Sequence, residues 1–323
     1  MMGPTAAKRQ KKMGLATRDA YGQALIELGK SDPRIVALDA DLSKSTKSGV
    51  FGKAFPDRFF NCGIAEADMV GIAAGLASSG KIPFASSFAS FLICKGFDQL
   101  RMSVANPHLN VKLVGSHGGI SLGEDGASQQ SVEDIALACA LPKFVVMVPA
   151  DEVACRALTR RAAEHVGPVF IRTGRPKAPI VYNEGEDFRI GKAKVLQSGS
   201  DVTLVAYGLM VWEALEAAEA LASKRVSATV IDMHTLKPLD EETLIAAAQR
   251  TGAVVTAEEH LLSGGLAARA AETLARHAPT PMEAVGIDDT YAESGTPAEL
   301  LEKYGLTARH IAAAAESVLK RKK

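Results

Sequence analysis

Residues 111–130 have the sequence VKLVGSHGGISLGEDGASQQ, a short apolar run that passes into a glycine-rich loop. The run predicts a buried strand, and a helical pattern starts near Ser131. Glycine permits positive φ angles and close backbone approach, while His117, Asp125 and Gln129 supply an imidazole, a carboxylate and an amide. Ligands of parallel sheets bind at the carboxyl ends of strands. We therefore expect a site in this loop, and a glycine-rich turn that only caps the next helix is the alternative.

Short β-branched runs alternate with alanine-rich amphipathic segments through most of the chain, which is typical of βα units on a parallel sheet. A stretch rich in proline, glycine and acidic residues interrupts the pattern and is interpreted as a linker. The predicted fold class is α/β, with two doubly wound domains. The predicted division is a disordered basic tail at 1–13, a first domain at 14–175, a linker at 176–190 and a second domain at 191–323.

The same pattern predicts the individual elements. Strands are expected at 34–38, 58–61, 83–86, 111–115, 144–148, 169–172, 203–206, 228–232, 254–257 and 283–286. Helices are expected from Thr17 onward and at 65–79, 89–105, 131–140, 151–165, 210–223, 240–250, 265–277, 297–303 and 307–321.

Composition excludes several classes of partner. The 323 residues include 37 Lys and Arg and 37 Asp and Glu, so the formal net charge is zero and no global field attracts nucleic acid or an anionic membrane. No apolar stretch approaches the ~18 residues of a membrane span, and no apolar region typical of a secretory signal follows the basic segment at 1–12. The four cysteines lack the spacing of a zinc site or a disulfide framework. We expect a cytoplasmic protein with no nucleic-acid or membrane partner and no metal ligands of its own.

Several residues have an ordinary explanation when each is taken alone. Glu66 stands at the start of an apolar helix, where an acidic side chain complements the helix dipole. Phe88 and Phe91 have the spacing of a core stripe, although an aromatic pair after a strand end can also hold a flat heterocycle. Arginine forks suit phosphate, and donors that could converge on a phosphate lie at element ends in Arg18, Ser45, Arg172 and Arg175, but they matter only if they meet in space.

The second domain offers metal-ligand types of residue without a metal-binding spacing. Glu258, Glu259, His260 and His234 match no H-E-x-x-H pattern and are predicted to be structural, at an interface or a strand end. The motifs G-x-x-x-x-G-K-[ST], G-x-G-x-x-G and G-x-S-x-G are absent from the sequence, so triphosphate, dinucleotide and hydrolase functions lack their anchors.

Seven segments taken together resemble the C-terminal half of transketolase, its pyrimidine-binding domain followed by its C-terminal domain. The resemblance runs from about Ala16 to the end of the chain. The segments are ATRDAYGQAL (16–25), IAE (64–66), FDQLRM (97–102), GSH (115–117), GEDGASQ (123–129), FIRTGRP (170–176) and LKPLD (236–240). Their ordered recurrence makes the resemblance specific.

The resemblance implies thiamine diphosphate as the cofactor, bound between two domains from different chains. Glu66 matches the glutamate that hydrogen-bonds the aminopyrimidine ring and promotes removal of the thiazolium proton. Phe88 and Phe91 match the aromatic pocket around that ring, and Asp41 matches a position near the thiazolium. Cys94 replaces an aromatic residue that some members have at a third position of the pocket.

The same resemblance assigns substrate contacts. Asp125 matches the carboxylate that recognises a ketose hydroxyl, while Gln129 stands where many microbial members have histidine and the animal-like branch has glutamine. Arg172 has no matching role. The positions that match the sugar-phosphate contacts are Arg18, Ser45, His117 and Arg175. The residues with implied catalytic roles are Glu66, His117 and Asp125.

The sequence lacks the family's N-terminal domain, in which a G-D-G motif and a later asparagine hold the diphosphate and a divalent metal, Mg or Ca. Our hypothesis is therefore a C-terminal subunit of a split transketolase, active only with an N-terminal partner subunit that supplies this site. It would transfer a two-carbon ketol unit between sugar phosphates in carbohydrate metabolism, such as the pentose phosphate pathway. Self-association is also expected, for example in a heterotetramer.

Three alternatives stay open at the level of sequence. The β subunit of a thiamine-dependent 2-oxo acid dehydrogenase has a similar size and domain order, and Glu66 would serve it equally well. His117, Arg18 and the segment 123–126 favour a phosphorylated sugar instead. Deoxyxylulose-phosphate synthase is another relative, normally one long chain. A regulatory subunit that kept the fold is the non-enzyme alternative, but it would be expected to lose Glu66, His117 and Asp125 first.

Overall fold

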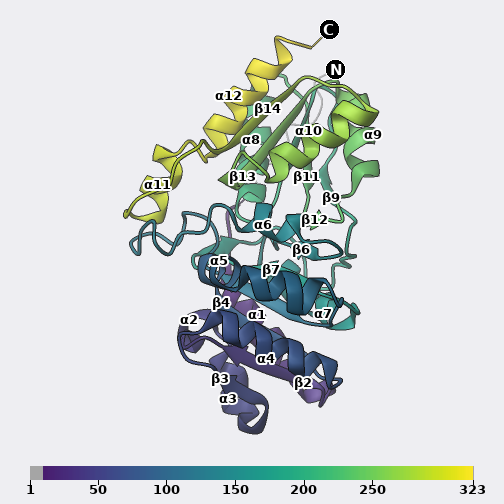
Figure 1. Ribbon diagram of the computed structural model, residues 1–323. Coiled ribbons are helices and arrows are strands. Elements are labelled where there is room, and N and C mark those ends of the chain that lie inside the picture. Colours follow the sequence, from purple (N-terminus) through teal and green to yellow (C-terminus); the bar gives the residue numbers. More distant parts are fainter. Residues whose placement is uncertain (1–9, 323) are drawn as a thin grey trace.

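The computed structural model describes residues 10–322, which form two α/β units that lie one above the other (Figure 1). Most of the predicted tail lies outside the described residues. Its last residue, Met13, begins strand β1 (Met13–Ala16), which pairs antiparallel with β8 (Lys177–Pro179). Neither short strand was predicted, because their pairing joins residues that are far apart in the chain.

A seven-stranded sheet, ordered β12-β6-β7-β5-β4-β2-β3, forms the centre of the N-terminal unit. Its parallel strands are β2 (Ile35–Asp39), β3 (Phe59–Asn61), β4 (Ile82–Phe88), β5 (Lys112–Ser116), β6 (Val145–Met147) and β7 (Val169–Arg172). Each lies within two residues of a predicted strand. The central strands are buried because helices cover both faces of the sheet, as expected for parallel strands with continuous apolar runs.

The helices of this unit divide between those two faces. Helices α1 (Thr17–Ser31) and α7 (Glu152–Glu164) pack together on one hydrophobic core, and α4 (Glu66–Ser78) and α5 (Ala89–Gln99) pack together on the other. The predicted helix at 89–105 divides into α5 and a π-helical segment, η2 (Leu100–Ala105). Two short helices, α2 (Ser43–Thr46) and α3 (Gly49–Ala54), were not predicted, since they are too short to show a period.

Helix α6 (Asp134–Ala140) begins three residues later than the predicted start at Ser131. Ser131 instead forms β-bridges with Gly118 and Gly119, which close the base of the loop at 115–130. The backbone groups of Ser131 are thus committed to the loop and cannot start the helix.

The C-terminal unit contains a five-stranded sheet, ordered β14-β13-β10-β11-β9. Its strands are β9 (Lys194–Gln197), β10 (Val202–Ala206), β11 (Ala228–Asp232), β13 (Val254–Leu261) and β14 (Met282–Ile287), with β9 antiparallel. Its helices are α8 (Met210–Ser223), α9 (Glu241–Thr251), α10 (Leu266–His277), α11 (Pro297–Lys303) and α12 (Ala308–Leu319). The α/β class and both doubly wound units are confirmed, while β9 was not predicted.

One strand crosses between the units. Strand β12 (Thr235–Lys237) belongs by sequence to the second unit but pairs antiparallel with β6 at the edge of the first sheet. The Lys237 ammonium strengthens this junction by donating to the carbonyls of Cys139 and Leu141, at 2.7 and 2.5 Å. The two units therefore share a sheet edge. Within residues 10–322, no helix is long and apolar enough to cross a membrane.

Candidate active site

Five of the predicted site residues form one continuous cluster near the carboxyl ends of the strands in the sheet of the N-terminal unit. Arg18, in the first turn of α1, donates from Nη1 to the carbonyl of Ser45 at 3.1 Å, and the same nitrogen lies 3.0 Å from His117 Nε2. The His117 ring stacks on Phe88, with ring centroids 3.8 Å apart. Phe88 in turn stacks on Phe91 at 5.6 Å. Arg18, Phe88 and Phe91, which each have an ordinary explanation when taken alone, thus lie together in the structure.

His117 is held in one protonation state. Its pKa falls to about 3 because the ring is buried and because the cations Arg18, Arg175 and Lys47 lie nearby. A guanidinium can only donate, so Nε2 accepts from Arg18, and Nδ1 carries the proton that it donates to Ser116 Oγ at 2.8 Å. Its φ of +60° lies in the left-handed region, which is uncommon for a residue with a side chain. The site thus contains a neutral imidazole with one assigned tautomer.

Glu66 is the first residue of α4, and its side chain is buried. Ser87 Oγ donates to Oε1 at 3.2 Å, and Lys95 Nζ lies 3.5 Å from Oε2. The Lys95 ammonium also lies 4.4 Å from the Phe91 ring centroid, so it connects the carboxylate to the aromatic pair. Sequence reasoning missed Lys95, although its position four residues after Phe91 places both on one face of α5.

Asp125 and Gln129 lie near the mouth of the site. Arg175 Nη1 is 4.0 Å from Asp125 Oδ2 and 3.0 Å from Glu124 Oε2. The Gln129 carbonyl accepts from Ser90 Oγ at 3.1 Å, which fixes the loop over the start of α5. Asp125 is 41% exposed and Gln129 is partly exposed, so both side chains are accessible to a ligand.

Asp41 follows β2 and is exposed, with a φ of +62°. Asn61 Nδ2 donates to its Oδ1 at 3.0 Å, and no hydrogen bond or ion pair of the described chain joins Asp41 to the His117 cluster. Its role near the thiazolium therefore stays a prediction.

Asp39, which sequence reasoning missed, closes the turn that carries Ser45. Its buried carboxylate accepts from Thr46 Oγ1 at 2.7 Å, Ser48 Oγ at 2.8 Å and the Leu42 N–H at 2.5 Å. Burial raises its pKa, and these donors partly offset that effect. The signal was the D-A-D sequence at the end of a predicted strand, which drew attention only to Asp41.

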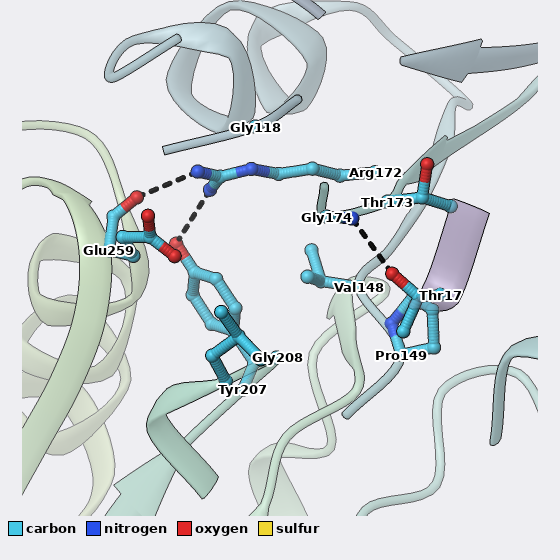
Figure 2. A pocket seen from close by; sticks show the side chains of 11 residues that line it. Thr17, Gly118, Val148, Pro149, Arg172, Thr173, Gly174, Tyr207, Gly208 and Glu259 are labelled. Carbon is cyan, nitrogen blue, oxygen red and sulfur yellow. Dashed lines mark hydrogen bonds between the residues drawn. The ribbon is translucent and has the colours of Figure 1, made fainter. Parts of the chain in front are cut away.

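Arg172 points toward Glu259 and Tyr207 of the C-terminal unit (Figure 2). Its Nη2 donates to the carbonyls of Glu259 at 2.7 Å and Ser131 at 3.3 Å, and its Nη1 donates to the Tyr207 hydroxyl at 3.5 Å. Arg172, Tyr207 and Glu259 line a cavity of about 30 Å³ between the units, which has room for about one water molecule. Arg172 is therefore a junction residue. It does not join Arg18 in a phosphate site, as its position at a strand end had allowed, because Glu259, Ser131 and Tyr207 occupy its guanidinium.

Comparison with known families matches two domains to the chain. Residues 13–180 match the pyrimidine-binding domain of transketolase, and residues 191–311 match the transketolase C-terminal domain. The chain belongs to the transketolase family. The predicted resemblance is thereby confirmed.

Individual relatives agree with this assignment. A Methanocaldococcus jannaschii protein described as a transketolase C-terminal section is 46% identical over 298 residues, which cover 91% of this chain and 93% of that protein. Human transketolase is 40% identical over 309 residues, 94% of this chain but 49% of the human protein. A solved structure titled "Split gene transketolase, inactive beta4 tetramer" has a TM-score of 0.90 and 52% identity, covering 96% of this chain and all of that one.

Transketolases depend on thiamine diphosphate, and the residues present fit the pyrimidine ring of that cofactor. A ring that stacks on Phe88 or Phe91 needs a hydrogen-bond partner for its nitrogen. Glu66 offers a buried carboxylate, and the exposed Lys95 is its ion-pair partner within the described residues. Among residues 10–322 there is no group of three or more His, Cys, Asp or Glu side chains that could hold a metal ion.

Glu258 and Glu259 of the second unit are structural residues, as predicted. Both are buried within β13, because this strand continues to Leu261, whereas the predicted strand ends at 257. Glu258 accepts the N–H groups of Leu266 at 2.7 Å and Ala267 at 2.8 Å, and so caps α10. Glu259 contacts the loop at 115–130 through the N–H of Ser121.

Proposed function

We propose that this chain is the C-terminal subunit of a split, thiamine-diphosphate-dependent transketolase that transfers a two-carbon ketol unit between sugar phosphates. The observation that carries this proposal is the unbroken line of contacts from Glu66 through Lys95, Phe91 and Phe88 to His117. The line joins a carboxylate, a flat aromatic surface and a neutral imidazole. It continues to a cation at Arg18, so one ligand could span a ring site and an anion site.

In one half of the site, the cofactor would be held by Glu66, Phe88, Phe91 and Asp41. Thiamine diphosphate supplies, when bound, the electron sink that stabilises a carbanion of the ketol unit. Glu66 would hold the pyrimidine ring by a hydrogen bond, and the stacked rings of Phe88 and Phe91 would exclude water from it. Glu66 thereby fixes which ring nitrogen carries a proton.

The substrate half of the site would bind the sugar phosphate. Arg18 Nε is a buried donor without a partner in the described chain, so it is available to an anion, and Arg175 lies close enough to act electrostatically on the same region. Ser45 and His117 complete the set of residues around that anion. Asp125 would accept a hydrogen bond from a ketose hydroxyl, and Gln129 would donate one from its amide.

An N-terminal partner subunit would supply the diphosphate site and its Mg or Ca ion. Exposed apolar side chains fit a protein partner: Phe60 in β3, Ile64 just before α4 and Ile72 in α4 expose 40%, 79% and 39% of their surface. We expect a heterotetramer that contains two copies of each subunit, since the family site lies between chains. All four cysteines are free thiols, which fits the cytoplasm and carbohydrate metabolism there.

A sulfonated sugar is a second candidate substrate. A Clostridium protein named 6-deoxy-6-sulfo-D-fructose transketolase subunit SqwH is 45% identical over 305 residues, which cover 94% of this chain and 95% of that protein. A sulfonate and a phosphate both suit the donors around Arg18. The sugar phosphate remains the first candidate, because two cations, Arg18 and Arg175, suit a dianion better than a monoanion.

The test is to assay the chain alone and with an N-terminal transketolase subunit, in the presence of thiamine diphosphate and Mg²⁺. Xylulose 5-phosphate, fructose 6-phosphate and 6-deoxy-6-sulfofructose serve as donors in separate reactions. We expect turnover of a phosphorylated donor only by the assembled pair. Turnover by the chain alone would contradict the split enzyme, and preferred use of the sulfonated donor would favour the second candidate.

A further inference from the structure

The loop at 115–130, which we name the sugar loop, is held from the C-terminal unit. The end of β13 contacts both sides of it. The Ser121 N–H donates to a carboxylate oxygen of Glu259, and the Leu261 N–H donates to the carbonyl of Val132 at 2.8 Å, just beyond the loop. A unit to which the family resemblance assigns no substrate contact therefore determines where the predicted substrate contacts lie.

The backbone of the sugar loop rests directly on two side chains. A Cβ atom at Gly119, which has a φ of +80°, would lie 2.2 Å from the carboxyl carbon of Glu259. A Cβ atom at Gly118 would lie 1.9 Å from Arg172 Nε. Figure 2 shows Gly118 alongside the Arg172 side chain, with Glu259 at its far end. These glycines are required because Glu259 and Arg172 occupy the space that a side chain would need.

The Glu259 carboxylate is well suited to fix a loop. Its residue is 6% exposed, and burial raises its pKa, while the Arg172 guanidinium and the Ser121 N–H lower it. A buried carboxylate needs donors, and the backbone of the sugar loop supplies one of them. A second attachment, from Gln130 Nε2 to the carbonyl of Glu293 at 3.0 Å, lies at the other end of the loop and also reaches the C-terminal unit.

We propose that Glu259 is a positioning residue, which holds the sugar loop so that His117, Asp125 and Gln129 face the sugar substrate. Glu259 acts through the Ser121 N–H and the Gly118–Gly119 backbone and does not itself touch substrate. The proposal rests on the proposed function for the role of the loop in sugar binding, but the loop attachment can be tested without activity.

The kinetic test is Glu259→Met in the assembled enzyme, which removes the acceptor of the Ser121 N–H at a similar side-chain length. We expect KM for the ketose phosphate to rise about tenfold, with kcat changed less than about threefold, because the loss weakens sugar binding before and during reaction alike. Thiamine diphosphate affinity should stay unchanged. Glu259→Asp, which keeps the charge on a shorter side chain, should recover part of the KM. The matched control is Asp232→Asn, another buried carboxylate of the C-terminal unit, far from the loop in sequence and bonded to Tyr182.

The structural test is amide hydrogen exchange in this chain. We expect the Ser121 amide to exchange at least about tenfold faster in Glu259→Met, which has no strong acceptor for the Ser121 N–H, than in wild type, with no change in Asp232→Asn. Unchanged Ser121 exchange in a folded variant overturns the proposal, as does a normal KM. If wild-type assemblies show no ketol transfer while Ser121 exchange responds as expected, the proposed function fails and the loop attachment stands.

Discussion

Two buried glutamates lie beside the first turn of a helix, one in each unit, and their surroundings differ. Glu258 has three hydrogen-bond donors from the protein: two backbone N–H groups of α10 and the Tyr207 hydroxyl, at 3.2 Å. Glu66 accepts from Ser87 and has one ion-pair partner, Lys95, whose side chain is 51% exposed. A carboxylate whose acceptor sites are filled by the protein is structural, whereas one with unfilled sites next to an aromatic pair is available to a ligand.

The largest expected effect comes from Glu66→Ala. Loss of the proposed pyrimidine contact should lower kcat of the assembled enzyme by roughly 10²–10⁴-fold, the range typical of a lost proton-transfer group. The unfolding free energy should change little, because Glu66 makes few bonds within the protein. Steady-state assays together with urea unfolding measure both quantities. Activity within threefold of wild type would remove Glu66 from the cofactor site.

The reverse pattern is expected for Glu258→Ala. This change leaves the N–H groups of Leu266 and Ala267 without their acceptor, which should lower the unfolding free energy by about 2 kcal/mol. Urea titration of this chain checks the loss. At a temperature where the variant is folded, kcat should stay near the wild-type value. A Glu258→Ala variant that is fully stable but inactive would mean that Glu258 serves activity and is not a structural residue.

A third buried carboxylate, that of Asp232, should make the unfolding free energy of the chain depend on pH. Burial raises its pKa in the folded protein to about 8, from an ordinary value of 3.8. The folded chain thus keeps a proton that the unfolded chain releases, so the stabilisation is complete below pH 3.8 and is lost as the pH rises toward 8. Unfolding free energies measured between pH 5 and pH 9 should decline less steeply in Asp232→Asn. Identical slopes in both proteins would show that Asp232 does not hold this proton.

The smallest effect is expected for Lys95→Met. Lys95 occupies one oxygen of Glu66, so its removal should tighten thiamine diphosphate binding by less than about fivefold, since a half-exposed ion pair contributes under ~1 kcal/mol. Cofactor titration of the assembled enzyme gives the dissociation constant. Weaker binding would mean that Lys95 assists the cofactor instead of competing with it.

Much of the fold could be predicted because its strands and helices are long enough to show a period. The parallel strands of both sheets lie where the apolar runs placed them, and α8 and α11 have the predicted bounds. The strands that were missed, β1, β8, β9 and β12, have three or four residues each, and their pairing joins distant segments. No local pattern records a pairing of that kind.

The candidate site divides in the same way. The sugar loop could be identified from its G-S-H and G-E-D-G segments, because glycines that permit tight turns alternate there with side chains that can bind a ligand. Lys95, Asp39 and Glu259 gave no such signal, since each matters through a neighbour that only packing brings close. Arg18 and His117 are 99 positions apart in the chain. The sequence therefore identified both residues as candidates but could not predict that they are in contact.

Strand β12 has a consequence for any attempt to divide this chain. A fragment that ends at residue 190 would lack β12 and leave the backbone groups of β6 unpaired along an open edge. Open strand edges recruit other chains, so such a fragment should precipitate or exchange strands between molecules. A dissection at the linker would therefore report aggregation instead of the properties of a free-standing pyrimidine-binding domain.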